Sequence, residues 1–227
     1  MLIRTVIIIF GLFIDIWFIR TEYSGRMTEA VILKGMASFC FVFLGFVSWI
    51  EVRTAFSTLV LIGLALGMMG DIFLNLRNLF DGSDSMKVFA VGIFFFLSGH
   101  FLYIAALIQE SPRIVWSAML LTAVLSVLAI PQLMKRITAP NRGLKIFGWI
   151  YLVVVIAMFS SALMLLVESG VRSGTVVFTI GALLFALSDF IMIYYSFGRK
   201  IKPLRAVNLL SYYIGQILIA LTIGLVN

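Results

Sequence analysis

Charged residues are scarce in this 227-residue chain, and their scarcity excludes a water-soluble globular protein. Lys, Arg, Asp and Glu make up 12% of the sequence, 63% of the residues are apolar, and the mean hydropathy is +1.16. Because a soluble domain must cover its surface with polar groups, this composition indicates a polytopic membrane protein. The net charge of +7 does not indicate nucleic-acid binding, since the cations lie in short loops and form no basic face.

Cysteine and histidine occur once each, so the sequence offers little for a disulfide or a metal site. Cys40 lies inside an apolar run and can form no internal disulfide. The lone histidine, His100, has no partner at metal-ligand spacing. We therefore expect neither a metal nor another cofactor.

Eight apolar runs are each long enough to cross a bilayer, which takes about 20 helical residues. Backbone groups in lipid must be hydrogen-bonded internally, so we predict an all-α bundle of eight transmembrane helices, one domain over residues 1–227. Turn-forming residues such as those at 140–143 mark the connections, and the first run is expected to be a retained helix. The predicted spans are about 2–19, 30–49, 57–76, 87–108, 114–131, 144–166, 174–197 and 205–226.

Lysine and arginine are distributed unequally between the two sides of the predicted bundle. Twelve lie in odd-numbered connections and four on the other side, with Lys34 inside the second span. The positive-inside rule therefore places the odd connections in the cytoplasm and both termini outside, in what we expect is a bacterial inner membrane. The twelve are Arg20, Arg26, Arg77, Lys87, Lys135, Arg136, Arg142, Lys145, Arg199, Lys200, Lys202 and Arg205, and the four are Arg4, Arg53, Arg113 and Arg172.

Two aspartates lie deep inside apolar runs. Asp71 follows Gly63 by eight residues, and Asp189 follows Gly181 by the same step, which hints at a four-plus-four internal repeat. An aspartate at the centre of a membrane helix costs roughly 2.5 to 3.5 kcal/mol, so such residues usually face the bundle interior and mark function. Two carboxyls in one low-dielectric site cannot both ionise, so one is expected to stay a neutral acid beside an ionised base.

Other polar residues are predicted at the depth of these aspartates. Lys34 falls in the same half of the bilayer, and His100 falls near the midplane. Helical periodicity defines two polar faces, since residues four apart lie on one side of a helix. One face carries Gly63, Gly67, Asp71 and Asn75, and the other carries Asn208, Tyr212, Gly215 and Gln216.

Several of these residues also have purely structural interpretations. The aspartates could form a catalytically idle pair, and Lys34 could neutralise one of them, extend to the interface, or bind a lipid phosphate. His100 could be a helix-packing donor. Most of the tyrosines, Tyr103, Tyr151 and Tyr213 among them, could belong to an interfacial belt. Asp15, near the inner end of the first span, is expected to be solvated or paired with neighbouring cations.

The order and spacing of these residues resemble the YhhN-like lysoplasmalogenase family from about Lys34 to Leu221. The resemblance rests on segments 70–74, 100–103, 151–158, 181–189 and 212–216, which contain Gly-Asp, His-x-x-Tyr, Ser-Asp and Tyr-Tyr-x-x-Gln patterns, and on Gly92. One departure is Gly35, where the family often has proline after the lysine.

The resemblance implies an eight-span, metal-independent membrane hydrolase that cleaves the vinyl ether bond of lysoplasmalogens to a fatty aldehyde and a glycerophospho-base. Its partners would be the lysophospholipid substrate and membrane lipid. Asp71 and Asp189 would be the catalytic acid and base, as in glycosidase carboxyl pairs. Lys34 and the cytoplasmic-side cations would receive the phosphate. Substrate-binding residues would be Lys34, Asn75, His100, Tyr103, Tyr151, Asn208, Tyr212, Tyr213 and Gln216.

A proton-coupled lipid or small-molecule transporter is the alternative, because it would use the same buried carboxylates and a repeat. The sequence shows no proline near either aspartate, whereas transporters of this kind often have broken helices at their binding sites.

The predicted orientation is tested by cysteine accessibility in a Cys40→Ala background. Lys135→Cys should react with a membrane-impermeant thiol reagent only after the inner face is opened, because the cation-rich connections are expected inside. Asn227→Cys should react in intact cells. Labelling of Lys135→Cys from outside would reverse the topology.

Overall fold

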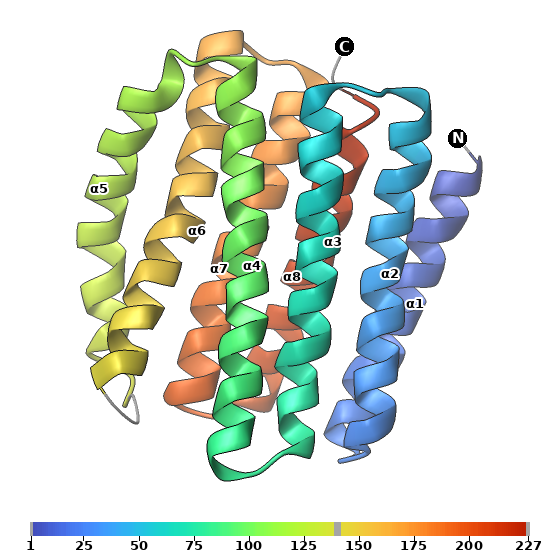
Figure 1. Cartoon of the computed structure of the whole chain (residues 1–227), viewed down its shortest axis with the longest axis vertical. Coiled ribbons are helices and arrows are strands. Elements are labelled where there is room, and N and C mark those ends of the chain that lie inside the picture. The colour runs from blue at the N-terminus through green and yellow to red at the C-terminus, as the bar shows by residue number, and fades with distance from the viewer. Residues whose placement is uncertain (1, 139–141, 226–227) are drawn as a thin grey trace.

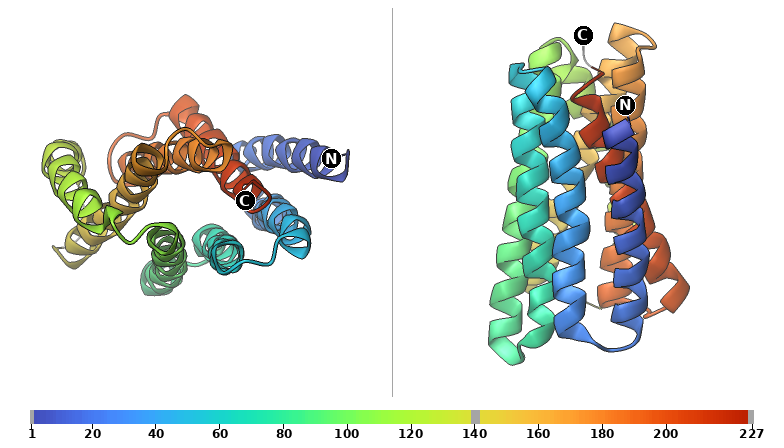
Figure 2. Two further views of the ribbon diagram at one scale, coloured as in Figure 1. Left: turned by 90° about the horizontal axis from the view of Figure 1, so that it is seen from above. Right: turned by 90° about the vertical axis from the view of Figure 1, so that its right-hand side faces the viewer.

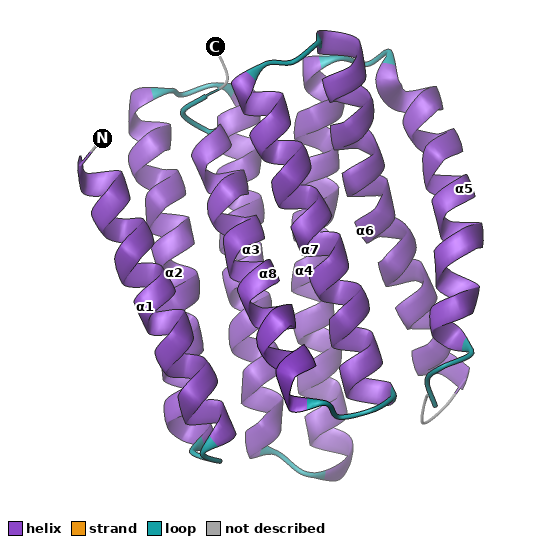
Figure 3. Ribbon diagram, turned by 180° about the vertical axis from the view of Figure 1, so that it is seen from behind, coloured by secondary structure: helices purple, strands orange, loops and turns teal. Residues whose placement is uncertain are grey.

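The computed structural model describes residues 2–138 and 142–225, and within these ranges it is entirely helical apart from short connections (Figures 1 and 3). The all-α prediction is confirmed, since eight of the helices are long and apolar enough to cross a membrane. Their bounds are α1 Leu2–Tyr23, α2 Met27–Glu51, α3 Ala55–Leu76, α4 Gly82–Glu110, α5 Ile114–Met134, α6 Arg142–Ser169, α7 Ser173–Phe197 and α8 Lys202–Thr222, with the short 3-10 helix η1 at Arg77–Leu79.

Each helix coincides with a predicted span, but several boundaries differ. α4 begins at Gly82 rather than near residue 87, and α8 covers Lys202–Thr222 rather than 205–226. α5 continues through Pro131, which lies inside the helix close to its end. These extensions occur because helical hydrogen bonds continue into polar flanking residues, which an apolar-run criterion omits. The turn residues Pro140 and Asn141 and the chain end at Asn227 lie outside the described residues.

The start of α3 is fixed by a capping box. The Thr54 hydroxyl accepts a hydrogen bond from the Ser57 backbone N–H at 3.0 Å, and the Ser57 hydroxyl accepts one from the Thr54 N–H at 2.8 Å. Two N–H groups that the first helical turn leaves unpaired are thereby satisfied. The cap sets where α3 begins and hence the depth at which Asp71 lies.

The helices form two curved rows when the bundle is viewed along its axis (Figure 2, left). One row contains α2, α3 and α4, and the other runs from α5 through α6, α7 and α8 to α1. Contacts of α2 and α3 with α8, and of α4 with α6, join the rows. We call the end with the α1–α2, α3–α4, α5–α6 and α7–α8 connections the odd end, and the opposite end the even end.

Two pairs of helices cross at glycines, where their backbones touch. A methyl group added to Gly99 of α4 would lie 3.0 Å from the Gly63 carbonyl oxygen of α3. One added to Gly215 of α8 would lie 2.9 Å from the Gly181 carbonyl oxygen of α7. Each crossing therefore contains the glycine that lies eight residues before an aspartate, and the internal repeat stays a prediction.

Gly181→Ala should destabilise the bundle. Its new methyl group would lie 2.9 Å from the Gly215 carbonyl oxygen, and a backbone atom cannot rotate away. Overpacking of this kind costs about 1–3 kcal/mol, so the thermal unfolding midpoint of the detergent-solubilised protein should fall. Gly148→Ala on α6 is the control, because no atom lies within 4 Å of the added methyl group. Equal midpoints for the two variants would contradict the close crossing.

Candidate functional site

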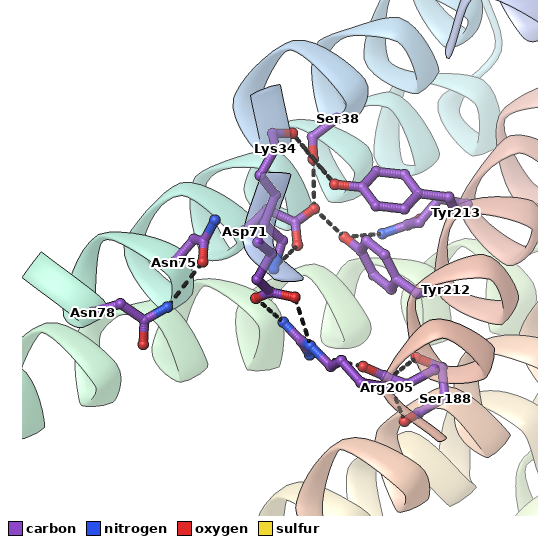
Figure 4. Close-up of polar contacts among 12 residues, drawn as sticks. Lys34, Ser38, Asp71, Asn75, Asn78, Ser188, Arg205, Tyr212 and Tyr213 are labelled. Carbon is purple, nitrogen blue, oxygen red and sulfur yellow. Dashed lines mark hydrogen bonds and ion pairs between the residues drawn. The ribbon is translucent and has the colours of Figure 1, made fainter. Parts of the chain in front are cut away.

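The Asp71 carboxylate lies in a buried set of polar side chains between the two helix rows (Figure 4). The Ser38 and Tyr212 hydroxyls each donate a hydrogen bond to Asp71 Oδ2 at 2.6 Å, and Lys34 Nζ lies 3.1 Å from Oδ1. The Tyr213 hydroxyl lies 3.3 Å from the Ser38 hydroxyl and donates to the Lys34 carbonyl oxygen. We call these five residues the Asp71 centre. Three donors, one of them cationic, stabilise a carboxylate in this low-dielectric position.

Helical spacing brings these groups together. Lys34 and Ser38 are one turn apart on α2 and so reach the same carboxyl group. On α3, Gly67 precedes Asp71 by one turn, and a methyl group there would lie 2.8 Å from Gln216 Nε2. The glycine therefore allows α8 to approach closely enough for Tyr212 to reach Asp71.

A chain of hydrogen bonds continues from the Asp71 centre toward α4. Gln216 Nε2 donates to the Tyr212 hydroxyl oxygen at 3.3 Å, and the Tyr103 hydroxyl donates to Gln216 Oε1 at 3.1 Å. All three side chains are buried. The predicted polar stripe of α8 thus faces the interior, and Tyr103 is a core residue rather than part of an interfacial belt.

Asp189 has a separate partner. The Tyr151 hydroxyl of α6 donates to Asp189 Oδ2 at 2.6 Å, and both side chains are buried. Tyr151 also borders a cavity of about 30 Å³, which is large enough for one water molecule. The two carboxyl groups therefore have separate hydrogen-bond donors, Tyr151 for Asp189 and Ser38 and Tyr212 for Asp71.

A chain of aromatic contacts links Tyr212, the partner of Asp71, to Tyr151, the partner of Asp189. The Phe185 ring is in edge contact with Tyr212 and with His100, at centroid distances of 5.2 and 4.7 Å, and His100 is 5.8 Å from Tyr151. His100 Nδ1 lies 2.6 Å from the Phe96 carbonyl oxygen, which can only accept, so Nδ1 carries the proton. His100 Nε2 is then an acceptor, and it is buried with no hydrogen-bond partner. We call Phe185, Tyr212, His100 and Tyr151 the aromatic wall. It contains several π systems and one hydrogen-bond acceptor without a partner among the described residues, His100 Nε2.

A second polar group lies at the odd end. Arg205 of α8 donates through Nε and Nη2 to the two carboxylate oxygens of Glu22 on α1, at 3.1 and 2.8 Å. Its Nη1 donates to Asn208 Oδ1 at 2.9 Å, and Asn208 Nδ2 donates to the carbonyl and hydroxyl oxygens of Ser188. Ser188 directly precedes Asp189, so this group ties α1, α8 and α7 together beside the second aspartate.

Asn75 is the least integrated of the predicted residues. It is buried one turn beyond Asp71, its Oδ1 accepts from Asn78 Nδ2 at 3.0 Å, and its Nδ2 has no hydrogen-bond partner. The structure thus places Asn75 beside the Asp71 centre without bonding the two, and leaves a buried donor there.

Sequence reasoning missed four polar residues of the bundle interior: Asp15, Ser38, Glu22 and Arg205. Asp15 was expected to be solvated or paired, but it is fully buried and neither carboxyl oxygen has a hydrogen-bond partner. Its position in an apolar run gave the same signal as Asp71. Ser38 was detectable as the residue one turn after Lys34. Glu22 and Arg205 lie at span ends, where sequence alone does not separate loop charges from interior ones.

A cavity at the even end is distant from both aspartates. Its volume is about 340 Å³, and its lining includes Glu168, Arg172 and Phe178. Along α7, Phe178 and Asp189 are eleven residues apart, or about 16 Å at 1.5 Å per residue. A group bound at this cavity would lie too far away to react at either carboxyl.

The fold and these side chains define a polytopic helical membrane protein with a charged, hydrogen-bonded interior. The YhhN family model matches residues 29–223, and the chain belongs to the YhhN family. Comparison with curated proteins and with solved structures gives no match. The matched residues include the whole Asp71 centre, both tyrosine-bonded aspartates and Arg205, whereas α1, with Asp15 and Glu22, lies outside them.

Replacing Lys34 alone should destabilise the protein strongly. Lys34→Met leaves the Asp71 charge buried without its cation, a loss of about 3–5 kcal/mol. Adding Asp71→Asn should restore most of that loss, and denaturant unfolding in detergent measures the difference. The control is Lys87→Met, which breaks the exposed Lys87–Asp84 pair and should cost no more than about 1 kcal/mol. Additive effects of the Lys34 and Asp71 substitutions would contradict the pairing.

Proposed function

We propose that this protein is a membrane hydrolase that cleaves the vinyl ether bond of a lysoplasmalogen, releasing a fatty aldehyde and a glycerophospho-base. Membership of the YhhN family is consistent with this activity. The observation that carries the proposal is the unequal setting of two buried carboxyls. Asp71 receives three donors including Lys34, whereas Asp189 receives the Tyr151 hydroxyl.

This inequality supports different roles for the two aspartates. The cation and two hydroxyls around Asp71 favour its carboxylate form, which suits a general base. Among the described residues, Asp189 accepts its hydrogen bond from one neutral hydroxyl and has no cation paired with it, unlike Asp71. Asp189 is therefore the better general acid.

Vinyl ether hydrolysis proceeds by three balanced steps with these groups. Asp189 gives its proton to the alkene carbon that is not bonded to oxygen, and the other alkene carbon and the ether oxygen become an oxocarbenium ion. Water adds to that carbon while Asp71 takes the water proton, which gives a hemiacetal. The hemiacetal hydroxyl then returns a proton to Asp189, the bond to the glycerol oxygen breaks, and Asp71 protonates that oxygen. One water is consumed and both carboxyls regain their starting states.

The aromatic wall suits the cationic intermediate. Tyr151, Phe185 and Tyr212 belong to this ring cluster, and a ring face placed against a positively charged carbon would stabilise it. His100 Nε2 offers an acceptor that would orient the attacking water. Lys34 acts here through Asp71, whose charge it balances, rather than as a direct phosphate ligand.

We also propose that the odd end faces the cytoplasm and that the membrane is a bacterial inner membrane. The excess of lysine and arginine in the odd connections supports this orientation. The charged residues Lys34, Asp71 and Arg205 would then lie in the cytoplasmic half of the bilayer.

Asp71→Asn and Asp189→Asn should each lower aldehyde release by roughly 10²- to 10⁴-fold, because each removes one proton-transfer group. The assay is purified protein in detergent with lysoplasmalogen and aldehyde detection. Asp84→Asn is the control, since Asp84 is an exposed residue in the first turn of α4. Retained elution volume and helical circular dichroism exclude unfolding as the cause.

Retention of most activity by both variants would refute the mechanism. A transporter would instead move the unaltered lipid across sealed vesicles and release no aldehyde. Aldehyde release by the wild-type protein therefore separates the two classes of function.

A further inference from the structure

Two arginines lie at the odd end, Arg205 near the start of α8 and Arg77 at the start of η1. Arg205 is paired with Glu22, whereas Arg77 lies over the Phe89 ring, 4.5 Å from its centroid, and forms no ion pair among the described residues. Both arginines are half-buried and only one of them has a carboxylate partner, so this end of the bundle favours a second anion.

The contact between Arg205 and Glu22 has the geometry of oxyanion recognition. Two nitrogens of one guanidinium fork meet the two oxygens of a single carboxylate. The same fork fits two oxygens of a phosphate group, which carries the same type of charge. A phosphodiester monoanion would therefore replace Glu22 without changing the net charge beside Arg205.

Glu22 lies on a helix that is suited to such an exchange. α1 is at the edge of the bundle, contacts α2 and α8, and lies outside the residues matched by the family model. Asp15, Phe18 and Glu22 fall on one face of α1, and the Phe18 ring is 5.9 Å from Lys34 Nζ. Because Asp15 and Glu22 are both acidic and both face the interior, α1 covers a basic region with an anionic face.

The distance from this arginine to the Asp71 centre suits a lysophospholipid. Arg205 and Tyr212 are seven residues apart on α8, or about 10 Å. The glycerol unit separates the phosphate of such a lipid from its sn-1 vinyl ether by a few covalent bonds, a comparable length. A phosphate at Arg205 would therefore place the vinyl ether near Tyr212 and Asp71.

We propose that Arg205, assisted by Arg77 at the same end of the bundle, binds the phosphate of the lysophospholipid, and that Glu22 occupies this site until the phosphate displaces it. This inference rests on the proposed function for the identity of its ligand. It narrows the expectation that Lys34 and the cytoplasmic-side cations bind the phosphate to Arg205, since Lys34 is paired with Asp71.

Equilibrium binding in lipid nanodiscs tests the site without requiring turnover. The probe is a saturated 1-acyl lysophosphatidylethanolamine, which has no vinyl ether, and 1-O-alkylglycerol is the matched probe without phosphate. Arg205→Gln should weaken binding of the phosphate probe roughly 10- to 100-fold, and Arg77→Gln should weaken it less. Glu22→Gln should tighten it roughly tenfold, because the competing carboxylate charge is gone. The alkylglycerol should bind equally to all variants.

Arg199→Gln is the control, because Arg199 is an exposed cation at the same end of the bundle. If Arg205→Gln does not fold, Arg205→Lys and Glu22→Gln still test the exchange. Arg205→Lys should weaken binding of the phosphate probe, and Glu22→Gln should strengthen it. Competition by inorganic phosphate would support a site open to water, and competition by lysophospholipid alone would support entry from the membrane.

Equal affinity of the Arg205 and Glu22 variants for the phosphate probe would overturn the inference, as would a parallel loss of alkylglycerol binding. Failure of the proposed function gives a different result. In that case no aldehyde is released from lysoplasmalogen, while the dependence of binding on Arg205 and Glu22 persists.

Discussion

The buried ion pair between Lys34 and Asp71 constrains the rest of this structure. A charge inside a membrane bundle persists only where opposite charge and hydrogen-bond donors surround it. Here the donors come from α2 and α8, and the carboxylate comes from α3, so three helices from both rows must meet at one depth. The cap at Thr54 fixes the start of α3, and the polar face of α8 carries Tyr212 to Asp71. The glycine crossings hold α3 against α4 and α8 against α7.

Much of this arrangement was predictable from sequence because lipid leaves few alternatives. The length of the apolar runs sets the number of spans, and helical periodicity places Asp71, Asn75, Tyr212 and Gln216 on interior faces. The structure confirms the eight-helix bundle and buries these side chains. Which donor reaches which acceptor depends on helix tilt and rotation, and a single sequence does not determine either.

Two residues whose burial was misjudged from the sequence show how helix tilt and rotation matter. Asp15 was treated as a near-interface charge, yet α1 turns it inward, and Arg205 was counted as a loop cation although it binds Glu22 inside the bundle. Both lie within a few turns of a span end, where one helical turn changes a residue from solvated to buried. A hydropathy window averages over several turns and cannot resolve this change, whereas the packing of neighbouring helices decides the burial of each single residue.

The two glycine crossings have a further consequence when they are considered as a symmetry. Gly63 with Gly99 and Gly181 with Gly215 give two similar half-sites, each followed by one aspartate. The half-sites are not equivalent in charge: Lys34, which follows a leucine near the start of α2, reaches Asp71, whereas Lys145, which follows a leucine near the start of α6, lies exposed. The two carboxyls lie at the same spacing from their glycines but differ chemically, because within the part of the chain that the structure describes only Asp71 has a lysine partner.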